Sequence, residues 1–336
     1  NFSYKSFATT FHQRNPHSNH SKFRIIKILG AGSFGKVLEV IAPNSSKSMA
    51  LKKINLSRTN TEEKKMIFTE LRILSGNNSP RIVGFTGAFI EGSFICICME
   101  KSSLGDLDGY IIQMQNQRQN IPNNIIYTML DDMSTGLHYL HKKAKIIHRD
   151  IKPSNILVYQ NMRLKLADFG ASILFTGNNH HLFTSHVPIG TPFYMSPEAI
   201  SAQVYSQKTD MWSLGCVLFE ILDLKTAFFA QNMTALTRQI RKGHHRILHR
   251  SEPKEIISLI PNLININHGQ RLSIEQLIDR LKIMNRNSLI NETLNNEGGF
   301  NDPNEDKSQK VPFSPLMWNK LLQEWNIAIS SKTLQK

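Results

Sequence analysis

Two short stretches carry side chains whose types and spacing suit phosphoryl transfer. The first reads HRDIKPSN at residues 148–155, and the second reads DFG and begins at Asp168. Asp150 could accept the proton of a substrate hydroxyl, and Lys152 could offset charge on the moving phosphoryl group. Asp168 could hold a magnesium ion and Asn155 a second metal ion. A lone HRD triplet is weak evidence, whereas the whole octet with DFG close behind it is specific.

The segment between the two stretches should fold them together. Residues 156–159 and 163–166 read as two short strands, with a turn at residues 160–162. Such a hairpin returns the chain so that Asp168 lies beside Asp150.

A glycine-rich stretch earlier in the chain is a second candidate phosphate site. Its glycines are Gly30, Gly32 and Gly35. A dinucleotide site has the same GxGxxG spacing, but it needs a helix here and an acidic residue about 20 positions on. Instead a strand is predicted before the glycines at residues 23–29, residues 37–41 are β-rich, and Lys52 follows. We therefore predict a hairpin that covers phosphates, since glycine lets the backbone approach closely.

A helix is predicted after the strand that carries Lys52. Residues 59–62 resemble a capping box, and Ile67 and Leu71 follow at helical spacing. Glu70 lies on the same inward face. Taken alone, it could equally be a partly exposed helix glutamate.

Composition limits the class of protein. The chain has 336 residues, three cysteines, a net charge of +14 and a pI near 9.7. Few cysteines argue against a disulfide framework, and no apolar run reaches the roughly 18 residues of a membrane span. We expect a cytoplasmic protein, with nuclear shuttling as an option, and no nucleic-acid partner. The densest basic cluster suits a solvated surface, an acidic partner or a membrane surface; it comprises Arg238, Arg241, Lys242, Arg246 and Arg250.

The remaining apolar patterns predict one large domain and a tail. Residues 94–99 read as a buried strand, and helices are expected over residues 123–142, from residue 210, and over residues 273–284. Residues 171–195 read as a long irregular segment.

Polar segments flank this domain. We predict a flexible leader over residues 1–22 and a linker over residues 285–312. Residues 313–336 are expected to form an amphipathic helix after Pro315, packed on the protein's own larger lobe or docking another protein. Its apolar residues are Phe313, Leu316, Met317, Trp318, Leu321, Leu322 and Trp325.

These motifs over residues 23–284 resemble those of eukaryotic protein kinases. The resemblance implies an α+β, bilobal fold, with a small antiparallel-sheet lobe with one main helix at residues 23–100 and a larger, mainly helical lobe at residues 101–284. It implies ATP and Mg²⁺ as cofactors and Lys52 paired with Glu70. The catalytic set would be Asp150, Lys152, Asn155, Lys52 and Glu70, with Asn155 and Asp168 as metal ligands.

The same resemblance assigns further residues to the nucleotide site. They are Gly30, Gly32, Gly35, Val37, Ala50, Lys52, Met99, Glu100, Ser102, Asp108, Leu157 and Asp168. Met99 would be the gatekeeper, and the backbone of Glu100 and Ser102 would face adenine. Asp108 could reach the ribose or simply cap a helix. Asp210 would brace the catalytic-loop backbone, and Arg271 would pair with Glu198.

Three stretches look like those of MAP kinase kinases. They are NSPRIVGFTGAF at residues 78–89, the CME run ending at Glu100 with Leu107-Asp108 after it, and KPSNILV from Lys152. This likeness implies a dual-specificity enzyme that phosphorylates threonine and tyrosine in a MAP kinase activation loop. The run GTPFYM at residues 190–195 instead resembles that of upstream kinases in such cascades, so a Ser/Thr kinase of another cascade tier is an alternative. A pseudokinase scaffold usually lacks Lys52, Asp150 or Asp168, and all three are present.

Phosphorylation of the irregular segment is expected to switch the protein. In related kinases an arginine before the catalytic aspartate, here Arg149, often binds a phosphate on this segment. Thr184 and Ser185 are the first candidates for modification by an upstream activating kinase, and Thr176 is the second. Thr191 is excluded, because its hydroxyl is expected to meet Asp150 and Lys152.

Overall fold

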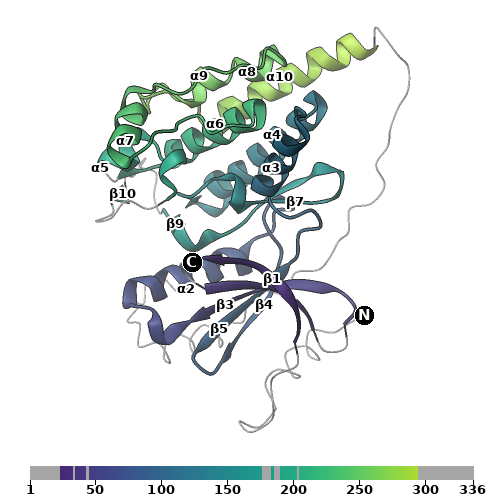
Figure 1. Ribbon diagram of the computed structural model, residues 1–336, viewed down its shortest axis with the longest axis vertical. Coiled ribbons are helices and arrows are strands. Elements are labelled where there is room, and N and C mark those ends of the chain that lie inside the picture. Colours follow the sequence, from purple (N-terminus) through teal and green to yellow (C-terminus); the bar gives the residue numbers. More distant parts are fainter. Residues whose placement is uncertain are drawn as a thin grey trace. The chain divides into compact units, whose positions relative to one another are not determined.

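The structure is a computed structural model that describes residues 23–32, 35–42, 45–175, 183–184, 190–202 and 204–293 (Figure 1). The described residues fall into two compact units. The first contains described residues from 23 to 78 and from 84 to 101, and the second contains residues 79–83 and described residues from 102 to 293. The antiparallel sheet of the first and the helices of the second confirm the predicted α+β class.

The first unit is built on a five-stranded antiparallel sheet with the order β1-β2-β3-β5-β4. Its strands are β1 (Arg24–Gly32), β2 (Gly35–Ile41), β3 (Ser48–Asn55), β4 (Phe85–Glu91) and β5 (Phe94–Glu100). β1 confirms the strand predicted over residues 23–29 and continues into the glycine-rich stretch. There Gly32 of β1 pairs with Gly35 of β2, so the predicted glycine hairpin forms.

Helix α2 (Thr61–Gly76) follows β3 and a 3-10 turn. Its capping box joins Asn60 and Glu63: the Asn60 side chain accepts the Glu63 N–H at 2.9 Å, and Glu63 Oε2 accepts the Asn60 N–H at 2.7 Å. The predicted box at residues 59–62 was wrong by one position, because Asn60 rather than Thr59 takes the N-cap. Ile67, Glu70 and Leu71 are buried, so the predicted inward face is confirmed.

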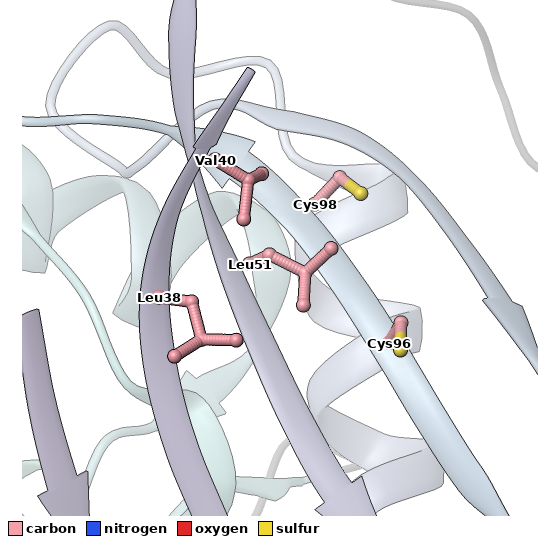
Figure 2. Packing of buried hydrophobic residues seen from close by; sticks show 5 residues of the cluster. All are labelled: Leu38, Val40, Leu51, Cys96 and Cys98. Atoms are coloured by element: carbon pink, nitrogen blue, oxygen red, sulfur yellow. The ribbon is translucent and has the colours of Figure 1, made fainter. Parts of the chain in front are cut away.

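The two faces of the sheet differ in what covers them. The α2 face carries Lys52, whose side chain reaches Glu70 of α2. The opposite face, here called the far face, carries a buried cluster of Leu38, Val40, Leu51, Cys96 and Cys98, which we call the far-face cluster (Figure 2). Both cysteines are free and buried in β5, which confirms a strand in this run.

The second unit is mainly helical. Its longer helices are α3 (Leu107–Gln117), α4 (Asn123–His138), α6 (Gln207–Asp223), α7 (Met233–Lys242) and α10 (Ile274–Thr293), and its shorter ones are α5 (Pro197–Ala202), α8 (Lys254–Ile257) and α9 (Ile260–Leu263). α6 is buried almost all round, as its apolar run requires, and confirms the core helix expected from residue 210. No helix of the described residues is both long and apolar enough to cross a membrane.

Short strand pairs in this unit adjoin the octet at residues 148–155, the DFG triplet and the segment that follows it. They are β6 (Ile146–Ile147) with β9 (Ile173–Leu174), β7 (Ile156–Val158) with β8 (Leu164–Leu166), and β10 (Phe183–Thr184) with β11 (Val204–Tyr205). The β7–β8 pair is the predicted hairpin, with its turn at Gln160–Met162. Asp132 of α4 holds its second strand by accepting the Leu164 N–H at 2.8 Å.

Two helix ends differ from the predictions. α4 ends at His138 and continues as a π-helix, Tyr139–Ala144, past the predicted end at 142. α10 runs to Thr293, so the linker boundary predicted at residue 285 falls inside a helix. Residues 285–293 contain no glycine or proline that would end it earlier. The predicted leader and tail helix lie outside the described residues.

Candidate active site

Asp210, near the start of α6, binds the backbone at the start of the octet at residues 148–155. Its carboxylate accepts the backbone N–H of His148 at 2.9 Å and of Arg149 at 2.9 Å, and it also bonds Nε2 of His141 at 2.8 Å. Burial acts to raise the pKa of Asp210, but the bond from His141 and the nearby His148 together lower it below its usual value. The predicted bracing of this loop by Asp210 is confirmed.

His148 ties the octet to the DFG triplet. Its Nε2 donates to the Ala167 carbonyl at 3.1 Å, because a carbonyl can only accept, and its ring lies 5.1 Å from that of buried Phe169. Nδ1 is then free to accept the Asp150 N–H at 3.4 Å. The histidine therefore fixes both stretches in one frame.

Asp150 lies at the centre of a compact polar group. Its Oδ1 accepts the N–H of Thr191 at 2.9 Å and the Thr191 hydroxyl at 3.0 Å. Its Oδ2 lies 2.7 Å from Nζ of Lys152 and 3.0 Å from Nδ2 of Asn155. Lys152 also donates to the Thr191 hydroxyl at 2.8 Å. The expected position of Thr191, against Asp150 and Lys152, is confirmed.

This group already shows the contact that its proposed chemistry needs. A carboxylate that takes a proton must lie within about 2.6–3.2 Å of the hydroxyl concerned, and Asp150 has that distance to an alcohol. The approach of the Thr191 segment depends on Gly190, where φ is +118° and a Cβ would come within 2.8 Å of the Arg149 carbonyl oxygen. Only glycine allows that approach.

Asn155 and Asp168 present the oxygen ligands that a magnesium ion prefers. The amide nitrogen of Asn155 donates to Asp150, at its carbonyl (2.9 Å) and its carboxylate, so Oδ1 is the atom left for a metal. The Ala167 N–H donates to the Asn155 carbonyl at 2.9 Å, which places the next residue, Asp168, on the same edge. Asp168 has left-handed backbone angles, φ 57° and ψ 80°, which for aspartate is uncommon. The donor set therefore fits Mg²⁺.

The first unit contains a buried ion pair of its own. Nζ of Lys52 in β3 donates to both carboxylate oxygens of Glu70 in α2, at 2.7 and 2.9 Å. The two side chains are 10% and 2% exposed. The predicted pairing is confirmed, and neighbouring Lys53 instead pairs with Glu91 at 2.6 Å, as strand alternation requires.

The glycine hairpin is tight at Gly35, where φ is +143° and a Cβ would lie 2.1 Å from the Lys53 carbonyl oxygen. Gly30 has open space instead, with no atom within 4 Å of a built Cβ. Val37 and Ala50 both lie on the α2 face by register, since Val37 pairs with Lys52, and Ala50 is two residues from it. These residues therefore share the face of the lysine that is expected to hold phosphate.

The residues expected around adenine and ribose are placed as follows. The N–H of Glu100 donates to the Gly84 carbonyl at 2.9 Å, so an adenine contact from Glu100 would have to use its carbonyl. Ser102 accepts the Gly105 N–H through its hydroxyl, and Met99 pairs with Ala50. Asp108 is not a helix cap: Asp106 takes that role at the start of α3 by accepting the Gly109 N–H at 2.8 Å.

Leu157 of β7 alternates with buried Ile156 and Val158 and is itself only partly buried. Its side chain therefore lies on the less buried side of the strand. Ser33 and Phe34, between the glycines, lie outside the described residues.

Two further buried contacts support the second unit. Arg271, fully buried, bonds both carboxylate oxygens of Glu198 at 2.7 and 3.1 Å, which confirms the predicted pair. The Tyr194 hydroxyl donates to Glu220 Oε2 at 2.7 Å beneath the Thr191 turn. Sequence reasoning missed this second pair, since nothing local in the sequence relates residues 26 positions apart.

Comparison with known proteins agrees with this geometry. The family described as protein kinase domain matches residues 23–281. The chain is 31% identical over 261 residues to the probable serine/threonine-protein kinase nek2 of Dictyostelium discoideum, covering 76% of this chain and 62% of that protein. It is 34% identical to human serine/threonine-protein kinase Nek5 (77% of this chain, 36% of Nek5) and 27% identical to human Nek2 (78% and 60%).

These relatives are Nek kinases, and none of them is a MAP kinase kinase, so the finer resemblance to MAP kinase kinases is not supported. The matching region is also only part of each relative, about one to two thirds of its length. The domain match, the HRDIKPSN octet bound to Asp210, and the Lys52–Glu70 pair lead to one conclusion: the chain belongs to the protein kinase family.

Proposed function

We propose that this protein is a serine/threonine protein kinase that transfers the γ-phosphoryl group of ATP to hydroxyl groups of proteins. The observation that carries the proposal is the hydrogen bond from an alcohol, the Thr191 hydroxyl, to Asp150, with Lys152 bound to both. The three relatives described above are all serine/threonine-protein kinases, which supports the same acceptor chemistry.

In the proposed reaction, the acceptor hydroxyl oxygen forms a bond to the γ-phosphorus while the bond from that phosphorus to the bridging β-phosphate oxygen breaks. ADP leaves with the bonding electrons, and the hydroxyl proton passes to Asp150. Lys152 stabilises charge on the transferred group. Lys52, oriented by Glu70, would bind the α- and β-phosphates. Asn155 and Asp168 would hold Mg²⁺, which when bound neutralises phosphate charge.

The test is a phosphorylation assay with purified protein, radiolabelled ATP, MgCl₂ and a general protein substrate. We expect label on serine or threonine from the unaltered protein and about a hundredfold less, or lower still, from a variant with Asp150→Ala. Equal labelling by both proteins would show that the activity comes from a contaminant or that Asp150 has no role.

A second candidate is a dual-specificity MAP kinase kinase. The run NSPRIVGFTGAF at residues 78–89 and KPSNILV from Lys152 favour it, whereas the Nek relatives favour single specificity. Incubation with a panel of inactive MAP kinases, followed by mapping of the sites, separates the two. Phosphotyrosine together with phosphothreonine in a MAP kinase loop would establish the second candidate, and phosphoserine or phosphothreonine alone would leave the first.

A further inference from the structure

The far face of the sheet in the first unit carries a row of apolar residues, with Lys36 and Lys53 further along the same face. Register places Leu38, Leu51 and Cys98 in one row, because each pairs with the next across β2, β3 and β5. Paired residues project to the same side of a sheet, so this row is on one face. β1 extends the row, since Ile28 pairs with Leu38 and Ile25 with Val40.

Burial of the far-face cluster is deeper than the sheet alone would give. Val40 and Cys96 are each 1% exposed and Leu51 is 4% exposed. Side chains stand roughly perpendicular to a sheet, so in-plane neighbours shield their flanks and leave their tips to a second layer about 10 Å away. On the opposite face that layer is α2. Ile25 and Ile28, at the β1 edge of the far face, are still 62% and 58% exposed.

The described residues supply little of that second layer. The partly buried hydrophobic side chains packed on the far-face cluster are Phe23, Met49 and Phe89. Phe23 directly precedes β1 and stacks on Phe89 at 5.5 Å between ring centroids, while Met49 and Phe89 belong to β3 and β4. This cover is therefore supplied by the sheet strands themselves and the residue before β1.

The sequence contains one segment with the pattern such a layer needs. Counted at 100° per residue, five apolar side chains of the tail fall within about 100° of one helical face; they are Trp318, Leu321, Leu322, Trp325 and Ile329. Asn319, Lys320 and Gln323 fall on the opposite side. A helix over residues 316–329 would be about 21 Å long, close to the roughly 19 Å that five strands span.

We infer that residues 316–329 form a helix that packs in cis on the far face of the sheet, with Trp318 and Trp325 over the far-face cluster. Residues 294–312 can reach about 60 Å when extended, more than the roughly 45 Å diameter of a domain of this size. The leader is the weaker candidate, because only three of its aromatic residues, Tyr4, Phe7 and Phe11, share one helical face, whereas the tail has five apolar residues there. This inference is independent of the proposed catalytic activity.

The free cysteines provide a direct test in the full-length chain. Cys96 and Cys98 belong to the far-face cluster, whereas Cys216 is buried in α6 of the second unit and is the internal control. Burial raises the pKa of Cys96 to about 11 and of Cys98 to about 12, so both thiols should label slowly while they are covered. Labelling with iodoacetamide is followed at each cysteine by mass spectrometry.

The test variant carries Trp318→Asp with Trp325→Asp, and its matched control carries Asn319→Asp with Gln323→Asp, which adds the same charge on the polar side. We expect Cys96 and Cys98 to label at least about tenfold faster in the test variant, equivalent to ~1.4 kcal/mol of lost protection. The control variant and Cys216 should keep their rates. A synthetic peptide of residues 313–329 should restore slow labelling.

Three results would overturn the inference. One is an unchanged labelling rate in the tryptophan variant. Another is acceleration on deletion of residues 2–21 but not on alteration of the tail, which would assign the cover to the leader. The third is protection that disappears on dilution of a dimer, which would assign it to a second copy. If the labelling of Cys216 also accelerates, the variant has unfolded and the labelling test does not apply. Hydrogen exchange of the unaltered chain then tests the inference, and unprotected amides over residues 316–329 would contradict the helix.

Discussion

Asp150 has little freedom to rotate, and this restraint suits its proposed role. One carboxylate oxygen accepts two bonds from Thr191, and the other contacts Lys152 and Asn155. A base aimed by four contacts loses little orientation entropy when an acceptor hydroxyl arrives.

Replacement of Asp150 by alanine should therefore affect turnover and not nucleotide affinity. We expect kcat to fall by about 10² or more, with the dissociation constant for ATP changed by no more than a few-fold. Single-turnover rates and a fluorescent-nucleotide titration measure the two quantities. Near-normal kcat with much weaker ATP binding would assign Asp150 to the wrong step.

Asp168→Asn and Lys52→Met should each abolish turnover in a protein that remains folded. The first removes charge from a metal ligand, and the second removes the cation expected on the phosphates, where charge is stabilised directly. Lys52→Met also breaks the buried ion pair with Glu70, so some loss of stability is expected. Circular dichroism checks the fold, and Lys53→Met, on the far face, is the control. Retention of ordinary turnover in either variant contradicts its assignment.

At the scale of elements, Glu220 of α6 joins the core helix to the turn that carries Thr191. Burial raises the pKa of Glu220 from an ordinary 4.5 to about 7, although its bond from Tyr194 lowers it and Asp108 raises it further. The folded state therefore holds this proton more tightly than the unfolded chain. Its contribution to stability is fully present below pH 4.5 and is lost as pH rises towards 7.

The substitution Glu220→Gln should remove that pH dependence, because glutamine stays neutral and can still accept from Tyr194. Between about pH 5 and pH 8 we expect the unfolding free energy of the unaltered protein to fall by roughly 3 kcal/mol more than that of the variant. Urea unfolding at a series of pH values measures the difference. Parallel curves for the two proteins would show that Glu220 does not titrate in this range.

Some contacts could be predicted from the sequence because a motif supplies both partners. Lys52 with Glu70, Glu198 with Arg271, and the Thr191 contacts followed from the kinase resemblance, which fixes partners far apart in sequence. The residue that caps the N-terminus of α2 was harder to predict. Thr59 and Asn60 are both good N-caps and are followed by adjacent glutamates, so the capping box was placed one residue early.

Other features had no sequence signal strong enough to decide them. Asp106 and Asp108 are both suited to begin α3, and only the backbone shows that Asp106 does so. The Tyr194–Glu220 bond joins two elements through tertiary packing alone. The end of α10 is not marked by a glycine or a proline. The helix was predicted from its apolar periodicity alone, and the predicted end therefore came too early.

At the scale of the whole molecule, the surroundings of Arg149 bear on how the proposed kinase would be regulated. Thr184 lies on β10, which pairs with β11, and Tyr205 of β11 lies 5.2 Å from the Arg149 guanidinium. Burial lowers the pKa of Arg149 to about 10, which still leaves it charged at neutral pH. Its Nε donates to the Ala171 carbonyl at 2.5 Å. The guanidinium is thus held beside the strand pair that contains Thr184, where a phosphate could bind it.

We predict that phosphorylation of Thr184 or Ser185 activates the protein, with Thr176 as the second choice. The side chains of these three residues lie outside the part of the chain that the structure describes. A phosphate adds about −1.5 to −2 charge and could order this segment through charge-assisted bonds to Arg149. Protein purified from eukaryotic cells should lose most of its activity on phosphatase treatment, and Thr184→Ala with Ser185→Ala should start from that low level. Thr234→Ala with Ser251→Ala, both exposed in the second unit, is the matched control and should behave as the unaltered protein. Full, phosphatase-sensitive activity in the Thr184 and Ser185 variant would place the switch at another residue, with Thr176 the next to replace.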